Sequence, residues 1–154
     1  MNATTELPFN GAGELRIAGG NCTPLVVDKP WGCETTLAVT PGFTVRRVEM
    51  KPFECLSQQG HLFKDEVYVV LAGSGRVELG ADRDVVVEID ARSTPLYLPA
   101  GTLHKTFSDG GGLLILEVST SYATDAVRVQ DQYGRGTMAP EDFQRFFRVF
   151  ARAR

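Results

Sequence analysis

Short runs of apolar and β-branched residues, separated by turns that contain glycine or proline, dominate the middle of the chain. The predicted strands span residues 35–39, 43–50, 66–71, 76–79, 85–89, 94–98, 103–107 and 113–118. Short, closely spaced strands of this kind predict an antiparallel β-sandwich or β-barrel. No helical periodicity occurs before the C-terminal end.

Two of these runs carry more detailed predictions. In 43–50 the alternating positions Thr44, Arg46, Val48 and Met50 share one face, which mixes polar and apolar side chains. A small barrel with a polar cavity would show this mixture. The run at 85–87, three consecutive valines, predicts a strand that is buried on both sides.

The two ends of the chain differ from the middle. Residues 1–23 are rich in Gly, Asn and Thr and predict a loose arm; residues 24–136 are expected to form the barrel, and 137–154 a C-terminal helix. Pro140 suits a first helical turn, and the acidic residues after it favour a helix N-terminus.

An aromatic stripe is predicted on that helix, because four phenylalanines recur at helical spacing: Phe143, Phe146, Phe147 and Phe150. One interpretation is a helix at a membrane surface. We prefer a helix that caps the barrel or contacts a dimer neighbour, since the protein is acidic and the helix short.

Composition narrows the class of protein. The 154 residues suit one soluble domain, and the net charge of -3 gives no bulk attraction to nucleic acid. No apolar run is long enough to span a membrane, and the N-terminus lacks the pattern of a signal peptide. The three cysteines have no metal-type spacing and are odd in number. We therefore expect a cytoplasmic protein without structural disulfides.

Candidate chemistry lies between Gln59 and His104. Alternation along a strand lets Gln59 and His61 point into one cavity. A turn at 62–65 would bring Glu66 back on the neighbouring strand, and the Pro99-Ala-Gly101 turn could deliver His104. Two imidazoles, one carboxylate and one amide oxygen suit a divalent first-row metal with open positions for water or substrate.

These residues resemble the two metal-binding motifs of the cupin superfamily, with Gln59 where the first motif usually has histidine. The resemblance implies a single-domain, all-β cupin jelly-roll barrel. A start at Lys29-Pro-Trp-Gly32 and a finish at Asp131-x-Tyr-Gly-Arg135 resemble, more narrowly, the cupin domain of type II mannose-6-phosphate isomerases. That domain also occurs as a stand-alone sugar-phosphate isomerase-like protein.

The resemblance implies a metal-dependent aldose–ketose isomerisation of a sugar phosphate through an enediol. The ion, zinc by preference with manganese, iron or nickel as alternatives, would be held by Gln59, His61, Glu66 and His104. Glu117 is the first candidate for the base, because it interrupts an apolar strand. Lys64 is the second, with a solvated lysine in the turn as the alternative.

Arg128 and Arg135 are candidate phosphate ligands, because a guanidinium can grip two phosphate oxygens. The alternative is a surface ion pair with Asp125 or Asp131. A homodimer is expected, because cupins often dimerise by exchanging strands; neither nucleic acid nor a membrane is expected as a partner.

The sequence departs from the family pattern at two places. Phe53 stands where a glycine is usual, and His61-Leu62-Phe63 stands where family members have a histidine-rich run. Two alternatives therefore stay open. One is a carbohydrate-binding or regulatory cupin without catalysis; the other is a different metal cupin, such as an iron dioxygenase.

Overall fold

The computed structural model describes residues 22–121, 125–135 and 138–151. The predicted arm thus lies almost wholly outside the described residues. Within the described ranges the chain forms nine strands and one helix. They are β1 (Leu25–Lys29), β2 (Gly32–Val39), β3 (Phe43–Met50), β4 (Gln58–His61), β5 (Glu66–Leu79), β6 (Val85–Asp90), β7 (Leu96–Leu98), β8 (His104–Thr120), β9 (Ala126–Gln130) and α1 (Pro140–Ala151).

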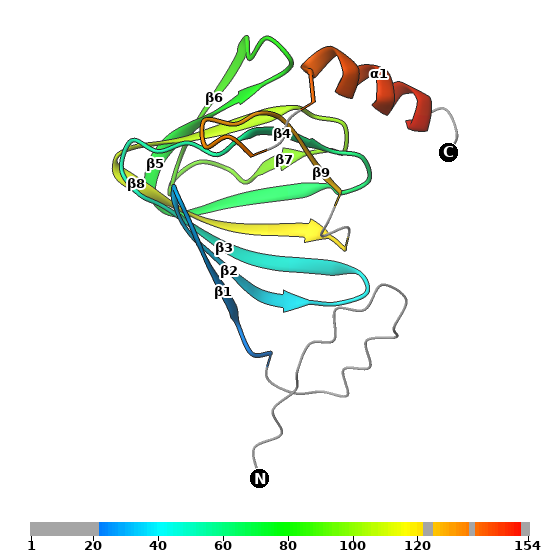
Figure 1. Cartoon of the computed structure of the whole chain (residues 1–154). Helices are drawn as coiled ribbons and strands as arrows, with labels where there is room; N and C mark the ends of the chain where they lie inside the picture. Colours follow the sequence, from blue (N-terminus) through cyan, green and yellow to red (C-terminus); the bar gives the residue numbers. More distant parts are fainter. Residues whose placement is uncertain (1–21, 122–124, 136–137, 152–154) are drawn as a thin grey trace.

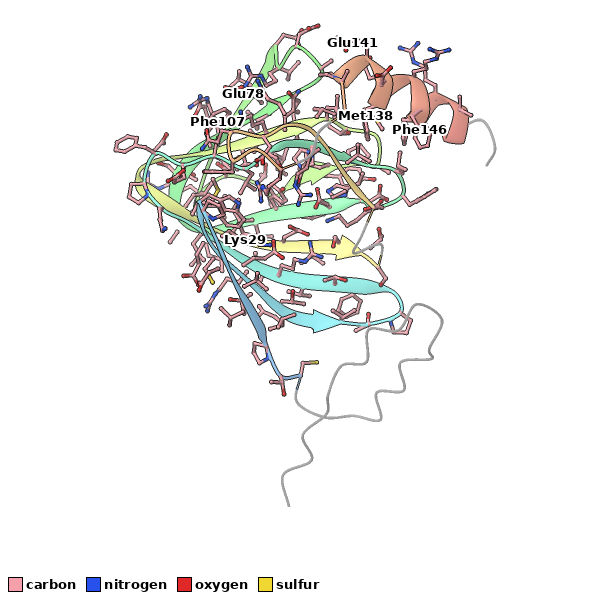
Figure 2. All side chains as sticks on the ribbon, in the orientation of Figure 1. Lys29, Glu78, Phe107, Met138, Glu141 and Phe146 are labelled. Atoms are coloured by element: carbon pink, nitrogen blue, oxygen red, sulfur yellow. The ribbon has the colours of Figure 1, made fainter. Side chains whose placement is uncertain are left out.

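All strand pairs are antiparallel and belong to one sheet, which curls into a half-barrel (Figure 1). One path through it runs β1-β2-β3-β8-β4-β9, while β5 pairs with β6, β7 and β8. The predicted class, mostly β with a short C-terminal helix, is confirmed. Side chains fill the space that the curled sheet encloses (Figure 2).

The long strands β5 and β8 pair with each other and run through the curl of the sheet. Both were predicted as two separate strands, because Gly73, Gly75 and 110–112 were interpreted as turns. The structure instead continues each strand through a bend. Gly73 has a φ of 78°, and a Cβ there would overlap the carbonyl oxygen of Gly112 on the partner strand. Glycine thus lets both strands continue through the bend, where the register between them shifts around Gly73.

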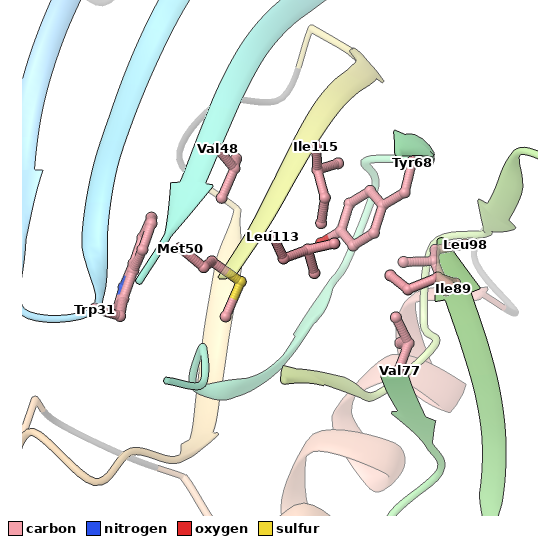
Figure 3. Close-up of a cluster of buried hydrophobic side chains, with 9 residues drawn as sticks. All are labelled: Trp31, Val48, Met50, Tyr68, Val77, Ile89, Leu98, Leu113 and Ile115. Atoms are coloured by element: carbon pink, nitrogen blue, oxygen red, sulfur yellow. The ribbon is translucent and has the colours of Figure 1, made fainter. Parts of the chain in front are cut away.

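The apolar core lies inside the bend. Its buried members are Trp31, Val48, Met50, Tyr68, Val77, Ile89, Leu98, Leu113 and Ile115 (Figure 3). Thr44, Val48 and Met50 are buried and Arg46 is half-buried, so the alternating face predicted for β3 is the inner face. Each fully buried aliphatic side chain is worth about 1.5–3 kcal/mol in transfer free energy.

The prediction for the valine run is wrong. Val85 and Val86 are 53% and 50% exposed. β6 pairs only with β5 among the described strands, so one of its edges is unpaired there. A run of valines fits an edge strand as well as a buried one, because β-propensity does not report burial.

Helix α1 caps the barrel, as preferred from the sequence. Phe143 is fully buried, and a Cβ on Gly60 of β4 would overlap its ring. Phe147 stacks on Phe143 with ring centroids 6.4 Å apart and packs against Gly101. Phe146, by contrast, is 45% exposed, and the side chain at 150 lies outside the description.

No helix in the described part of the chain is long and apolar enough to cross a membrane.

Candidate metal centre

Three strands bring the predicted ligands together. Gln59 and His61 lie on β4, Glu66 begins β5, and His104 begins β8. Gln59 pairs directly with His104 in the ladder between β4 and β8. The expectation that β4 and Glu66 lie on hydrogen-bonded neighbours is wrong: β4 pairs with β8 and β9, whereas β5 pairs with β6, β7 and β8. The curl of the sheet, not a hairpin, brings Glu66 to the histidines.

His61, Glu66 and His104 form a compact buried cluster. Nε2 of His61 lies 3.3 Å from Oε1 of Glu66, and Nε2 of His104 lies 3.4 Å from Oε2. One ligand atom from each of the three residues lies within 4.8 Å of the other two. The three side chains are at most 3% exposed.

The hydrogen bonding of this cluster fits a metal ion. Nε2 of both histidines and both carboxylate oxygens of Glu66 are buried and make no hydrogen bond. Unsatisfied buried polar atoms are costly, so four that converge on one point indicate a missing partner. Nδ1 of His104 lies 3.0 Å from the carbonyl oxygen of Thr102, which can only accept, so Nε2 of that ring is left free to bind a metal. The donors suit zinc and its neighbours.

Gln59 lines the adjoining cavity together with His61. Its Oε1 accepts a hydrogen bond from the Ser57 hydroxyl at 3.1 Å. Its role as a fourth ligand stays a prediction.

The structure adds a residue that sequence reasoning did not assign. Asp125 precedes β9, and its Oδ1 lies 2.9 Å from Nδ1 of His61. Its Oδ2 accepts the backbone N–H groups of Phe63 and Lys64 at 2.8 Å each. The suggested ion pair between Asp125 and Arg128 is thus replaced by contacts with the metal centre. No local spacing signals this, because Asp125 is 64 residues from His61.

Lys64 is not a solvated turn residue, because it is only 2% exposed. Its Nζ lies 2.6 Å from Oε1 of Glu66, at an ion-pair distance but without hydrogen-bond angles, and 3.3 Å from Oε1 of Glu117. Arg46 Nη1 reaches the same Glu117 oxygen at 3.4 Å. Both candidate bases, Lys64 and Glu117, therefore lie in one buried ionic network, and Arg46, which was not a predicted site residue, belongs to it as well.

Burial and charge act on this network in opposite directions. Burial disfavours the charged Glu66 carboxylate, but the nearby His61, His104 and Lys64 side chains outweigh it, so the pKa of Glu66 lies below its usual range. Burial lowers the pKa of His104. Burial and the nearby Glu66 charge raise the pKa of Glu117. A carboxyl with a raised pKa suits proton transfer near neutral pH.

A cavity of about 240 Å³ opens beside the cluster. Its lining includes Lys64, Glu117, Arg128 and Arg135, so all four predicted catalytic and phosphate-binding residues face one space. The lining residues that the sequence did not assign to the site are Lys29, Trp31, Glu34, Arg46, Val48, Leu56, Ser57, Tyr68 and Ala126.

The two predicted phosphate ligands differ in their partners. Arg135 binds Asp131 through Nε at 2.8 Å and Nη2 at 2.7 Å, which is the ion pair considered as the alternative. Arg128 has a buried Nε without a hydrogen-bond partner. Arg128 is therefore the better placed of the two to receive an anion.

Residues 23–131 match the family model described as mannose-6-phosphate isomerase C-terminal. The chain belongs to this family. The mannose-1-phosphate guanylyltransferase of Klebsiella pneumoniae is 34% identical over 111 residues, which are 70% of this chain and 23% of that protein. The alginate biosynthesis protein AlgA of Pseudomonas syringae pv. tomato is 35% identical over 115 residues, which are 72% of this chain and 23% of that protein. The chain thus spans about a quarter of the length of these relatives.

Solved structures support the fold of this mannose-6-phosphate isomerase C-terminal domain. The capsular polysaccharide assembling protein CapF from Staphylococcus aureus matches with a TM-score of 0.61 and 17% identity, over 72% of this chain and 34% of that one. A double-stranded β-helix protein from Klebsiella pneumoniae matches with a TM-score of 0.56 and 14% identity, over 75% and 90%. The predicted cupin jelly roll is confirmed.

Proposed function

We propose that the chain is a metal-dependent sugar-phosphate isomerase that interconverts an aldose and a ketose. The observation that carries the proposal is the arrangement of the cavity. The unsatisfied His61–Glu66–His104 cluster, a buried carboxyl with a raised pKa and an unpaired arginine Nε adjoin one space. The names of the family and of its relatives make mannose phosphates the first substrates to test.

His61, Glu66 and His104, with Gln59 as a possible fourth donor, would hold the ion. A bound zinc, manganese, iron or nickel ion would supply Lewis acidity toward the carbonyl and adjacent hydroxyl oxygens of the sugar.

The chain's own groups would bind the substrate and move the proton. Arg128 would bind the phosphate, with Arg135 held beside it by Asp131. Glu117 would take the proton from C2 of the aldose and return it to C1, while a hydroxyl proton passes from O2 to O1. Lys64 and Arg46 both contact Oε1 of Glu117, which leaves Oε2 for the transfer.

Solvent exchange tests this mechanism. The full chain is loaded with zinc and, in separate samples, with manganese, iron and nickel, and is incubated with mannose 6-phosphate in D2O. We expect fructose 6-phosphate and deuterium at the exchanging carbon in NMR spectra, because the proton on Glu117 equilibrates with solvent. Glu117→Gln should keep the metal and lose exchange. Neither conversion nor exchange with any of the four ions would refute the proposal.

A second candidate is a sugar-phosphate-binding domain without turnover. The contact of Lys64 Nζ with Glu66 Oε1 at 2.6 Å favours it, because this ammonium can neutralise the cluster without a metal. Calorimetric binding of mannose 6-phosphate by metal-free protein, without conversion by the loaded protein, would support it.

We also propose a homodimer, which sedimentation velocity at micromolar concentration would test; a monomer there would contradict it.

A further inference from the structure

Asp125 lies outside the cluster and contacts both the candidate ligand His61 and the bend that carries Lys64. Asp125 uses Oδ1 for Nδ1 of His61 and Oδ2 for the N–H groups of Phe63 and Lys64. Each carboxylate oxygen therefore has its own partners. Oδ1 orients the imidazole of His61, and Oδ2 holds the backbone of the bend between β4 and β5.

The contact with His61 selects one tautomer. An ionised carboxylate can only accept hydrogen bonds, so Nδ1 of His61 carries the hydrogen. In a neutral ring Nε2 is then unprotonated, and Nε2 is the atom that faces Glu66 at 3.3 Å. A metal ligand needs this tautomer, because a protonated nitrogen cannot donate its lone pair.

The contact with the bend sets the position of Lys64. The backbone N–H of Lys64 donates to Oδ2 of Asp125 at 2.8 Å. This bond fixes the backbone from which the Lys64 side chain enters the cavity lining. Its Nζ then lies between the carboxylates of Glu66 and Glu117. The hydrogen bond from Asp65 N to the Thr120 hydroxyl at 3.0 Å holds the next residue of the same bend.

We infer that Asp125 is a positioning residue that holds His61 in the Nδ1–H tautomer and fixes the bend that carries Lys64 into the cavity. The expected effect of Asp125 on zinc affinity rests on the proposed metal site. The tautomer itself can be measured without metal, substrate or turnover.

Asp125→Asn is the sharpest variant, because it keeps the size of the side chain. The two backbone N–H groups require an acceptor, so the amide oxygen must face them. The amide NH2 then faces His61 and donates to Nδ1, which moves the ring hydrogen to Nε2. The substitution should therefore reverse the tautomer without opening a cavity.

Asp90→Asn is the matched control. Asp90 also accepts two backbone N–H groups, from Arg92 at 2.7 Å and Ser93 at 3.0 Å, but it is an exposed residue at the end of β6, opposite Ser74 of β5. It measures the general cost of replacing such a carboxylate by an amide.

The experiment uses the full, metal-free chain, labelled with ¹⁵N, at a pH high enough to neutralise both imidazoles. Long-range ¹H–¹⁵N NMR spectra report the tautomer, and the chain has only two histidines. We expect Nδ1–H for His61 in the wild type and in Asp90→Asn, and Nε2–H in Asp125→Asn. His104, held by Thr102, should keep Nδ1–H in all three proteins.

Zinc affinity, measured by competition with a chromophoric chelator, is the second readout. Asp125→Asn should bind zinc about 10- to 100-fold more weakly, and Asp90→Asn within about twofold of wild type. An unchanged tautomer in Asp125→Asn, or Nε2–H in the wild type, would overturn the inference. The wild-type spectrum tests the assignment of the His61 tautomer even if Asp125→Asn fails to fold. A wild type that shows Nδ1–H but binds no zinc would instead refute the metal-dependent function and leave the positioning role intact.

Discussion

Replacing Phe143 by alanine tests whether the C-terminal helix stabilises the barrel. Phe143 is 0% exposed and packs on Gly60, the residue between Gln59 and His61. Truncation removes this contact and the stacking with Phe147 at 6.4 Å. Phe→Ala substitutions in protein cores cost about 3–5 kcal/mol. We expect about 3 kcal/mol, because α1 can move into part of the space that the ring leaves.

Urea unfolding of the full chain measures the change. Trp31, the only tryptophan, is buried in the barrel core rather than under α1, so its fluorescence reports the barrel. Circular dichroism reports the whole chain, and coincident transitions would show that helix and barrel unfold together. Val149→Ala is the control on the same helix. Val149 is 65% exposed, and its truncation should change the free energy of unfolding by less than about 0.5 kcal/mol.

Gly60→Ala supplies the complementary variant. The added Cβ would overlap the ring of Phe143 and so destabilise the wild type, but the smaller side chain in Phe143→Ala leaves room for it. The double variant should therefore be less destabilised than the sum of the two single ones. A loss below about 1 kcal/mol in Phe143→Ala, or strict additivity in the double variant, would refute the reasoning that this contact anchors the helix.

Three further predictions concern the cavity and its surroundings. His104→Ala should lose stoichiometric zinc in mass spectrometry, because one of three buried ligands is gone; full zinc occupancy would contradict the proposed site. Arg128→Ala should weaken binding of mannose 6-phosphate in calorimetry by at least tenfold, since its buried Nε lacks a hydrogen-bond partner that a phosphate could supply, whereas unchanged affinity would remove it from the phosphate site. Arg135 holds the pKa of Asp131 at about 2, so the ion pair stabilises the fold above the ordinary pKa of aspartate and is lost as the pH falls through about 2. The difference in unfolding free energy between wild type and Asp131→Asn should thus be constant above about pH 5 and shrink toward pH 2; a pH-independent difference would contradict it.

Local patterns were enough to predict which residues form the candidate metal cluster. His61 is two residues from Gln59 and five from Glu66, and a Pro-x-Gly turn precedes His104, so alternation and turn chemistry limit where each side chain points. The structure brings one candidate ligand atom from each of His61, Glu66 and His104 within 4.8 Å of the other two. Asp125 could not be predicted in the same way. It meets His61 only because β9 pairs with β4, a choice between strands that alternation within one strand does not encode.

The same limit explains the errors in the strands. Glycines 73 and 112 were interpreted as turns, whereas they lie close together at a bend where the register between β5 and β8 shifts and both strands continue. A glycine permits either conformation, and only the partner strand decides between them. Strand β1 was not predicted either. It pairs with β2 across the two-residue connection Pro30–Trp31. Leu25 and Val26 of β1 are more than half exposed, so this strand has no apolar face toward the core that a pattern could reveal.

Lys64 shows what the fold adds to the chemistry. A lysine in a turn normally remains in water, because a buried ammonium is costly without a charged partner. Here the bend is held by Asp125, and the ammonium lies between Glu66 at 2.6 Å and Glu117 at 3.3 Å. A metal ion bound by Glu66 would repel this ammonium and push it toward Glu117. Ion binding at Glu66 and the charge around the proposed base Glu117 are therefore coupled through Lys64, the cation that both carboxylates share.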